Sequence, residues 1–269
     1  MKKINNLFLG LLVCAFICTT TTFAQEEKAE EEFKPMYLVV TTLHWSTDSD
    51  ADFTDWAETE QEYFDKVTSK NDLIAGSGYY THYFTPDNSE LLSVSVYKTW
   101  DDIDKANEVT NKLIMAGWPD EDARNAFFEK QSSYYSSKHG DEIYTTFPFR
   151  KEMKTDSTEP VLVYVRKNTA SDEVGKGYKE FFDNVTMKNK YIKEFYTHGH
   201  LWGADARDRF EVGIYDNLAD IEKAFEENER LIKEHWPNED TRKAFFKEYD
   251  KMFAGHGDYI YTSVPKLSK

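Results

Sequence analysis

The chain has 269 residues, of which 40% are hydrophobic, 16% aromatic and 30% charged, and its formal net charge is −16. So acidic a protein is not expected to bind nucleic acid or anionic lipid, because phosphate binding needs clustered Lys and Arg. The composition is that of a globular protein with enough apolar residues for a sizeable core.

Residues 1–24 have the pattern of a secretory signal peptide. Lys2 and Lys3 precede a short apolar run, and small residues lead to a cleavage position after Ala24. The run is too short to span a bilayer as a helix, although an uncleaved anchor is the alternative. We therefore expect a secreted or periplasmic protein with no membrane association after signal removal. Both cysteines, Cys14 and Cys18, would leave with the signal, which excludes disulfides and thiolate chemistry.

The Glu-rich residues 25–34 predict an acidic tether, and residues 35–150 predict one ferredoxin-like unit. Residues 35–43, 78–84, 91–97 and 143–147 are rich in strand-forming residues. Helices are expected after residue 52, after Thr99 with Asp102 completing a capping box, and after Trp118-Pro119. Gly140, and Gly257 in the second half, are expected to end a helix. The resulting order is βαββααβ.

The second half repeats this pattern after a linker at residues 151–159. Residues 62–128 align without a gap with residues 180–246 at an offset of 118, and 27 of the 67 pairs are identical. A repeat of this length indicates a duplicated domain rather than a solenoid. Residues 160–269 therefore predict a second ferredoxin-like unit. Each unit has helices on one face of its sheet, so the two sheets are expected to cover each other.

The predicted fold is α+β: tandem duplicated ferredoxin-like domains that pack sheet to sheet as a pseudo-dimeric α+β barrel. This arrangement resembles the dimeric α/β-barrel superfamily, which includes antibiotic-monooxygenase-like proteins, small stress-responsive proteins and the haem-binding chlorite-dismutase-like group. The resemblance covers nearly the whole chain after residue 24. It implies a ligand site in the barrel interior or the cleft between the repeats, and it implies no particular reaction. Because the fusion replaces a dimer, we expect a monomer.

Strand alternation selects a candidate pocket. His82 and His200 occur at equivalent positions of the two repeats, as do Tyr97 and Tyr215, and all four are predicted to face the opposite sheet. The alternative is a His–Tyr hydrogen bond that satisfies polar groups in a packed core.

A metal site is conceivable in the second repeat only. His198 and His200 point the same way on one strand, and Glu211 on the next strand would be a third ligand.

Three further histidines are secondary candidates. His139 with Asp141, and His256 with Asp258, form a repeated His-Gly-Asp pattern. Each pair is either a general base at the barrel mouth or ordinary chemistry of a helix C-terminus. His235 lies in a place loosely similar to the helix histidine that holds haem in the chlorite-dismutase-like group, so the resemblance implies haem as a further alternative.

The sequence favours a secreted protein that binds a small molecule in the barrel interior or the inter-repeat cleft. The alternative is a cofactor-free or metal-assisted enzyme, monooxygenase-like or isomerase-like, that uses His82 or His200 for proton transfer. A purely structural duplicated domain is the third reading. No sequence motif identifies a cofactor, a substrate or a catalytic residue.

Overall fold

The computed structural model describes residues 33–47, 52–152 and 158–269. The expected signal peptide and nearly all of the expected tether lie outside these residues. The helices and strands of these described residues all belong to one compact unit, Lys34–Lys269. Within the described residues, no helix is both long enough and apolar enough to cross a membrane.

Eight antiparallel strands form a closed barrel in the order β1-β3-β2-β8-β5-β7-β6-β4. The first half of the chain contributes the strands β4-β1-β3-β2 and the second half contributes β8-β5-β7-β6. The barrel closes where β2 pairs with β8 and where β4 pairs with β6. The strands are β1 (Tyr37–His44), β2 (Gly76–Phe84), β3 (Glu90–Tyr97), β4 (Gly140–Thr146), β5 (Leu162–Ala170), β6 (Glu194–Trp202), β7 (Asp208–Tyr215) and β8 (Phe253–Ser263). The predicted mixed α+β barrel is thus confirmed.

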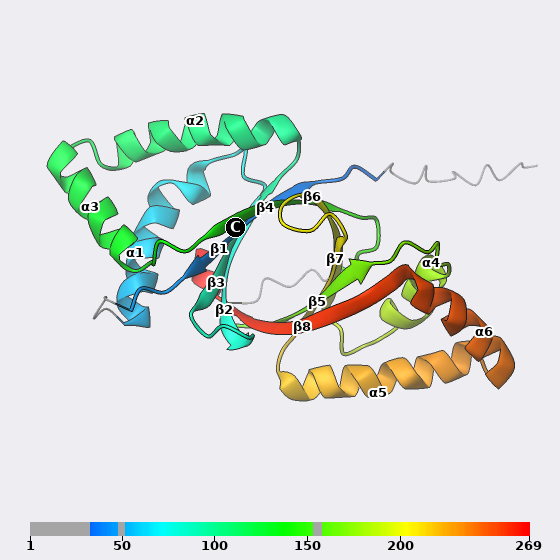
Figure 1. The fold of residues 1–269 in the computed structure, drawn as a ribbon. Coiled ribbons are helices and arrows are strands. Elements are labelled where there is room, and N and C mark those ends of the chain that lie inside the picture. The colour runs from blue at the N-terminus through cyan, green and yellow to red at the C-terminus, as the bar shows by residue number, and fades with distance from the viewer. Residues whose placement is uncertain (1–32, 48–51, 153–157) are drawn as a thin grey trace, which may run out of the picture. The chain divides into compact units, whose positions relative to one another are not determined.

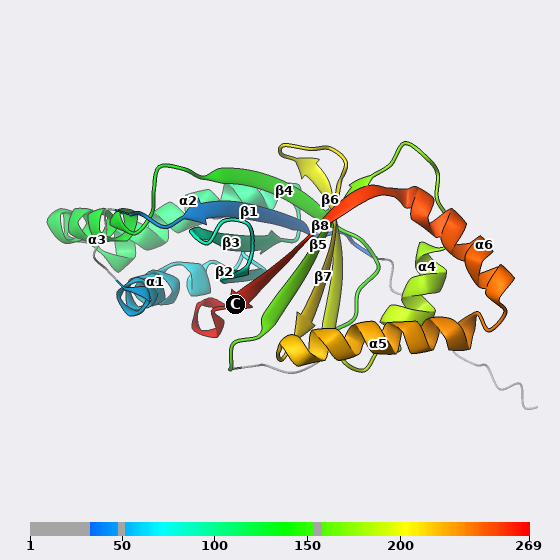
Figure 2. The ribbon, with the colours of Figure 1, turned by 60° about the horizontal axis from the view of Figure 1, so that its bottom comes forward.

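The helices of the two halves lie on opposite sides of the barrel (Figures 1 and 2). The first half carries α1 (Phe53–Lys66), α2 (Trp100–Gly117) and α3 (Glu121–Ser133), with a short 3₁₀ turn η1 (Thr68–Lys70). The second half carries α4 (Tyr178–Phe181), the π-helical turn η2 (Phe182–Thr186), α5 (Leu218–His235) and α6 (Glu239–Tyr249). Two further 3₁₀ turns, η3 (Asp250–Met252) and η4 (Pro265–Leu267), flank β8.

The helix starts are fixed by side-chain caps. Thr99 accepts a hydrogen bond from the backbone N–H of Asp102, and the Asp102 carboxylate accepts one from the N–H of Thr99, so the predicted capping box is present. Asn217 caps α5 at the equivalent position. The helix ends differ from the prediction. Gly140 begins β4 and Gly257 lies inside β8, because α3 and α6 already end at Ser133 and Tyr249.

The apolar core lies in the two layers between sheet and helices. In the first half it is centred on Trp56, Leu91 and Tyr134, and in the second on Leu162, Phe182 and Tyr215. The aliphatic side chains that point into the barrel belong to none of the five core clusters of the described residues, and most of them are only half-buried. They are Leu38, Val40, Leu92, Val94, Val96, Val163, Val165, Val212 and Ile214.

Candidate functional site at the barrel seams

The two places where the halves of the barrel join each put a histidine beside a tyrosine. We call the β2–β8 pairing the first seam and the β4–β6 pairing the second seam. His82 pairs with Tyr261 across the first seam, and His200 pairs with Tyr144 across the second. Each of these histidines therefore has a tyrosine neighbour, as predicted. The neighbours are Tyr261 on β8 and Tyr144 on β4, however, and not the predicted Tyr97 and Tyr215.

Strand register places Tyr97, Tyr215 and Glu211 on the other face of the sheet. Glu211 is opposite Thr197, whereas His198 is opposite Phe210. Directly paired residues share a face, and a shift of one residue exchanges the faces. The predicted grouping of these three residues with the histidines is therefore wrong, since alternation within one strand does not fix the register with the next.

The helix-facing residues have partners of their own. Tyr97 packs with Ile74 and Ala106 in the core under α2. Tyr215 is buried in the core of the second half. Glu211 accepts hydrogen bonds from the Tyr178 hydroxyl at 2.7 Å and from Asn168 at 3.1 Å. The metal site predicted from His198, His200 and Glu211 is not assembled, and the described residues contain no group of three or more His, Cys, Asp or Glu that could hold a metal ion.

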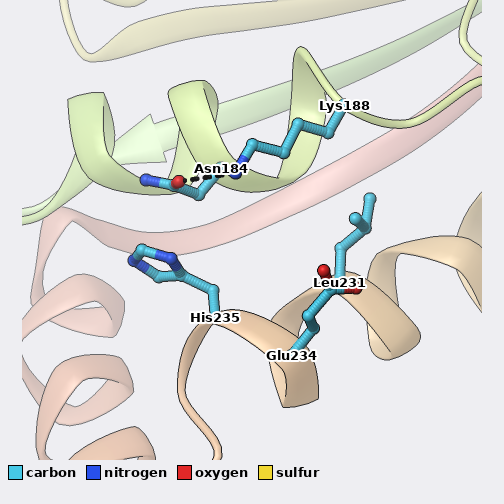
Figure 3. Close-up of a pocket in the computed structure, with 5 residues that line it drawn as sticks. All are labelled: Asn184, Lys188, Leu231, Glu234 and His235. Atoms are coloured by element: carbon cyan, nitrogen blue, oxygen red, sulfur yellow. Dashed lines mark hydrogen bonds between the residues drawn. The ribbon is translucent and has the colours of Figure 1, made fainter.

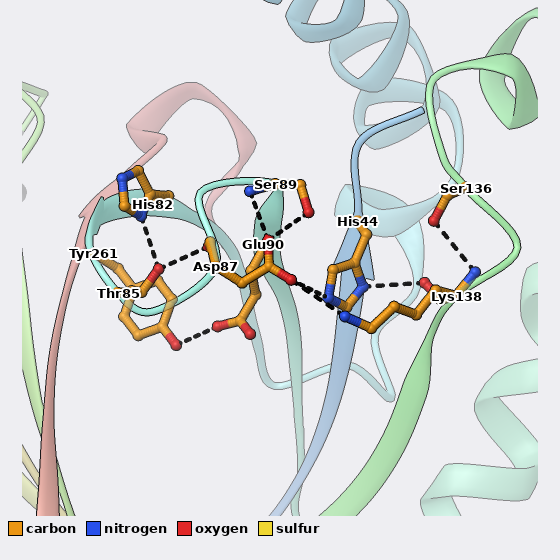
Figure 4. A network of polar contacts seen from close by, with 9 residues as sticks. All are labelled: His44, His82, Thr85, Asp87, Ser89, Glu90, Ser136, Lys138 and Tyr261. Atoms are coloured by element: carbon orange, nitrogen blue, oxygen red, sulfur yellow. Dashed lines mark hydrogen bonds and ion pairs between the residues drawn. The ribbon is translucent and has the colours of Figure 1, made fainter. Parts of the chain in front are cut away.

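The first seam is satisfied by the protein's own groups (Figure 4). His82 Nδ1 lies 2.7 Å from Thr85 Oγ1, and that hydroxyl donates to the backbone oxygen of Asp87 at 2.9 Å. The buried Tyr261 donates to Glu90 Oε1 at 2.6 Å. Burial raises the pKa of Tyr261, with Glu90 adding to the effect, so this phenol stays protonated.

A second histidine, His44, holds the loop above the first seam. Its ring is buried, with Nδ1 3.1 Å from the Lys138 carbonyl oxygen and Nε2 3.3 Å from Asp87 Oδ2. Lys138 Nζ lies 3.2 Å from the same carboxylate oxygen. Hydrogen bonds from Ser89, reinforced by Lys138, hold the pKa of Asp87 well below its usual range. His44 was missed by sequence reasoning because the second repeat has no histidine at the equivalent place.

The second seam leaves two histidine nitrogens without partners. Nδ1 of His198 and Nδ1 of His200 are both covered by protein atoms and make no hydrogen bond. Tyr144, buried beside them, presents its ring edge to His200 with a centroid distance of 6.5 Å and donates to Glu142 Oε2 at 2.5 Å. A buried polar atom without a partner costs about 1–3 kcal/mol, so each such atom calls for an explanation.

The pKa shifts at this seam favour the neutral forms of His198 and Tyr144. Desolvation lowers the pKa of His198 to about 4. Its ring keeps some surface toward the barrel interior, but protein atoms surround it closely enough to disfavour the imidazolium. Desolvation also raises the pKa of Tyr144, and the hydrogen bond to Glu142 raises it further. At neutral pH the His198 imidazole is therefore neutral and the Tyr144 phenol is protonated.

An ion pair lies on the inner wall next to this seam. Asp208 is 2% exposed and lies 2.7 Å from Lys167 Nζ, and the Lys167 ammonium lies over the Phe210 ring at 5.5 Å. Phe210 in turn packs edge-on against Tyr144 at 4.8 Å. The second seam and the neighbouring inner wall thus bring together two unpartnered imidazole nitrogens, one phenol and the Lys167 cation.

The repeated His-Gly-Asp pairs lie away from both seams. His139 Nε2 is 3.9 Å from Asp141, and His256 Nε2 is 3.3 Å from Asp258, with all four side chains exposed. Asp141 accepts from Thr41 and Asp258 from Tyr164, which places both aspartates on the helix-facing side of their strands. Asp141, His256 and Asp258 lie in strands and His139 directly precedes β4, so the helix-end interpretation does not fit them.

His235, the residue for which the resemblance implied haem ligation, lies at the edge of a small hollow beside α5 (Figure 3). Its Nε2 lies 3.1 Å from Glu180 Oε1, and its ring stands edge-on to Trp236. The adjacent hollow has a volume of about 130 Å³ and is lined by Asn184, Lys188, Leu231, Glu234 and His235 itself. A large planar macrocycle needs an apolar cavity several times larger, since sites for such ligands span roughly 300–1,000 Å³. The residues around His235 do not fit haem.

A buried carboxyl group in the first half was also missed. Glu60 on α1 is 1% exposed, accepts hydrogen bonds from Tyr135 at 2.7 Å and from Tyr79 and Gln131 at 3.1 Å, and has no cation within ion-pair distance among the described residues. Burial raises its pKa. The only sequence signal was an acidic residue on the apolar face of the predicted helix, which a helical projection would have shown.

No protein-family model matches the sequence, and no curated protein matches it. Solved structures do match its fold. A protein of Fusobacterium nucleatum, whose name assigns it to the monooxygenases, aligns with a TM-score of 0.54 at 12% identity, over 87% of this chain and 94% of that one. A chlorite dismutase variant of Candidatus Nitrospira defluvii in complex with cyanide aligns with a TM-score of 0.52 at 12% identity, over 88% and 93%. The resemblance to the dimeric α/β-barrel superfamily is confirmed at the level of the fold.

Proposed function

We propose that this chain is an enzyme of the α+β-barrel type that performs acid–base chemistry on a small molecule at the second seam. One observation carries the proposal: His198 and His200 point into the barrel with Nδ1 atoms that no protein group satisfies, while the equivalent His82 has its partner. Structural histidines are normally hydrogen-bonded, whereas groups that act on a substrate are left free for it. That proteins named as enzymes share this fold also supports the proposal.

Each residue of the seam has a distinct role in this proposal. His200 accepts a proton from the bound molecule, since its ring lies beside the protonated Tyr144. Tyr144, whose one hydroxyl proton is donated to Glu142, offers its phenol oxygen as an acceptor that orients a donor group of the bound molecule. His198 remains neutral and orients the ligand by hydrogen bonding, because its lowered pKa disfavours the imidazolium. The reaction class is a proton transfer of the isomerase or cofactor-free oxygenase type.

Room for the ligand is proposed inside the barrel. Inward-facing aliphatic residues such as Leu38, Val94 and Ile214 are only half-buried, although strands surround them on all sides. Side chains packed against each other in a core would have lost nearly all of their accessible surface. This residual exposure supports the proposal of a mostly apolar space between the walls, with His198, His200 and Tyr144 at one seam.

We further propose that the two halves arose by duplication and that the product is secreted. Asn71 and Asn189, which differ in number by the repeat offset of 118, support the duplication. Both are fully buried, and each donates to a backbone oxygen of the following long helix, Ala106 or Ala224, at 2.9 or 2.8 Å. A repeated internal contact of this kind is expected when two units share an ancestor. Secretion is supported by residues 1–24 alone.

Hydrogen–deuterium exchange into small molecules tests the enzymatic proposal. The purified chain in D₂O would be incubated with a panel of small carbonyl compounds and phenols, and exchange at acidic C–H positions followed by NMR. We expect catalysed exchange with at least one compound. His200→Gln should slow it about 100-fold or more, since general bases contribute roughly 10²–10⁴-fold.

His82→Gln is the matched control at the first seam and should leave the exchange rate within about threefold, because His82 is engaged with Thr85. Equal rates in wild type and His200→Gln would refute the assignment of the base. Binding without any exchange would favour the alternative of a binding protein.

A further inference from the structure

The two seams differ at one position in a way that indicates what the second seam binds. In the first half, Thr85 places its hydroxyl 2.7 Å from His82 Nδ1. The equivalent residue of the second half, at the same offset of 118, is Gly203. Gly203 has no side chain, and the Nδ1 of His200 is one of two buried histidine nitrogens without a hydrogen-bond partner in the described part of the chain. The missing hydroxyl and the missing hydrogen bond therefore coincide.

We propose that the second seam binds a hydroxyl group of its ligand at His200 Nδ1, in the position that Thr85 Oγ1 takes at His82. This inference rests on the proposed function, because it assumes that the second seam is the ligand site. The ligand class is a small molecule bearing an alcohol, enol or phenol hydroxyl. A ligand hydroxyl both donates and accepts, so it can satisfy the ring nitrogen in either tautomer, whereas Thr85 Oγ1 donates to Asp87 and accepts from His82.

At Gly203, the Glu142 carboxylate occupies the space that a side chain would fill. A Cβ atom at Gly203 would lie 2.4 Å from Glu142 Oε1, and the backbone N–H of Ala204 donates to that same oxygen at 2.9 Å. Glu142 also orients Tyr144. Replacing the hydroxyl-bearing residue by glycine thus makes room for the carboxylate that positions the phenol, and it leaves the hydroxyl site of His200 to be filled from outside the chain.

Access to His200 Nδ1 requires a local movement. The nitrogen is covered in this structure, so the ligand hydroxyl reaches it only when the β6–β7 tip shifts or the ring rotates. Gly203 has a φ of +153°, a conformation that side chains disfavour, and glycine gives this tip the freedom to move. The exposed Trp202 next to it, at 71% exposure, does not anchor the tip in a core.

Histidine-ring NMR with a matched pair of probes tests the inference. Phenol and toluene have nearly the same shape, and only phenol carries a hydroxyl. In the full wild-type chain, phenol should shift the His200 Nδ1 resonance and leave that of His82 unchanged, while toluene should leave both unchanged. Cyclohexanol extends the test to an aliphatic alcohol. His200→Gln should weaken phenol binding about tenfold, the loss expected for one hydrogen bond.

Two variants of Thr85 make the test reciprocal. Thr85→Ala removes the hydroxyl and leaves space, so phenol should now shift His82 Nδ1 as well. Thr85→Val removes the hydroxyl but keeps the volume, so phenol should still leave His82 unaffected. Equal responses of His200 to phenol and toluene, or no response to either, would overturn the hydroxyl assignment. The exchange assay would still report separately on proton transfer at the seam.

Discussion

The hydrogen bonding of the histidine Nδ1 atoms distinguishes the second seam from the first. His82 Nδ1 has a hydrogen-bond partner in Thr85, whereas Nδ1 of His198 and Nδ1 of His200 have none. Among single residues, His198 has a pKa shift that should change the free energy of unfolding with pH. It is surrounded by protein in the folded state, and its pKa falls from 6.5 to about 4.

The stability of the chain should depend on pH through His198. Because its folded pKa lies below its unfolded pKa, the unfolded state binds more protons between pH 6.5 and pH 4. The contribution of His198 is therefore complete above pH 6.5 and is lost as the pH falls through about 4. Urea unfolding at several pH values should show that His198→Gln removes up to about 3 kcal/mol of this acid sensitivity.

The proper comparison for that experiment is the difference between wild type and variant at each pH, because other groups titrate in the same range. His139→Gln serves as a control on an exposed histidine and should leave the pH profile of wild type unchanged. Parallel profiles for wild type and His198→Gln would show that this ring is not desolvated.

Among the elements, helix α1 is held to its sheet by a buried acid rather than by apolar contacts alone. Glu60 receives hydrogen bonds from Tyr79 on β2 and from Gln131 and Tyr135 in and after α3, so one carboxyl group connects three elements. Trp56 donates to the Tyr135 hydroxyl at 2.7 Å and completes the network. The second half has Tyr178 at the position of Glu60 and bonds it to Glu211, so the carboxyl comes from the sheet instead.

Replacing Glu60 tests the element-scale network. Its folded pKa is raised, so the folded state binds more protons, and the stabilising contribution present below pH 4.5 is lost as the pH rises through the folded pKa. Glu60→Gln cannot ionise, and its unfolding free energy should lack this decline. Denaturant titrations from pH 4 to pH 8 would measure it, with the exposed Glu121→Gln as the matched control. A wild-type profile that rises instead would show that the three donors outweigh burial.

Some features of the helices and strands could be predicted from the sequence, and others could not. Strand and helix positions, the capping box at Thr99 and the barrel class follow from local patterns, because alternation, periodicity and caps are local properties. The face of each strand that points inward does not follow. It depends on the register between β6 and β7, which no residue of either strand specifies alone, and this is why Tyr97, Tyr215 and Glu211 were placed on the wrong face.

The candidate site was only partly predictable for the same reason. His82, His198 and His200 were found from the repeat and from their spacing, and they do point into the barrel. Their tyrosine neighbours come from β4 and β8, strands of the opposite half at each seam. A contact between residues that are 56 positions apart, as for Tyr144 and His200, is set by barrel closure and leaves no local sequence signal.

At the scale of the whole molecule, each half depends on the other for its edges. Residues 34–151 alone would keep β2 paired with β3 and β4 with β1 but would leave one edge of each exposed, and exposed strand edges recruit partners. We expect the chain from residue 25 to be a monomer and the isolated first half to associate. Sedimentation velocity of both would test this. A monomeric, cooperatively unfolding first half would show that the seams are not needed for stability, and a dimeric full chain would contradict the role of the fusion.

The closure of both seams within one polypeptide has an evolutionary consequence. In a homodimer, every substitution is present at both seams. A change that removes a stabilising contact at one seam therefore removes it at the other as well, and the loss of stability doubles. Here Thr85 and Gly203 are encoded separately. The first seam can keep the hydrogen bond between Thr85 and His82, while the second seam lacks it and, in the function proposed above, leaves that position to a ligand. Selection can therefore act on each seam independently.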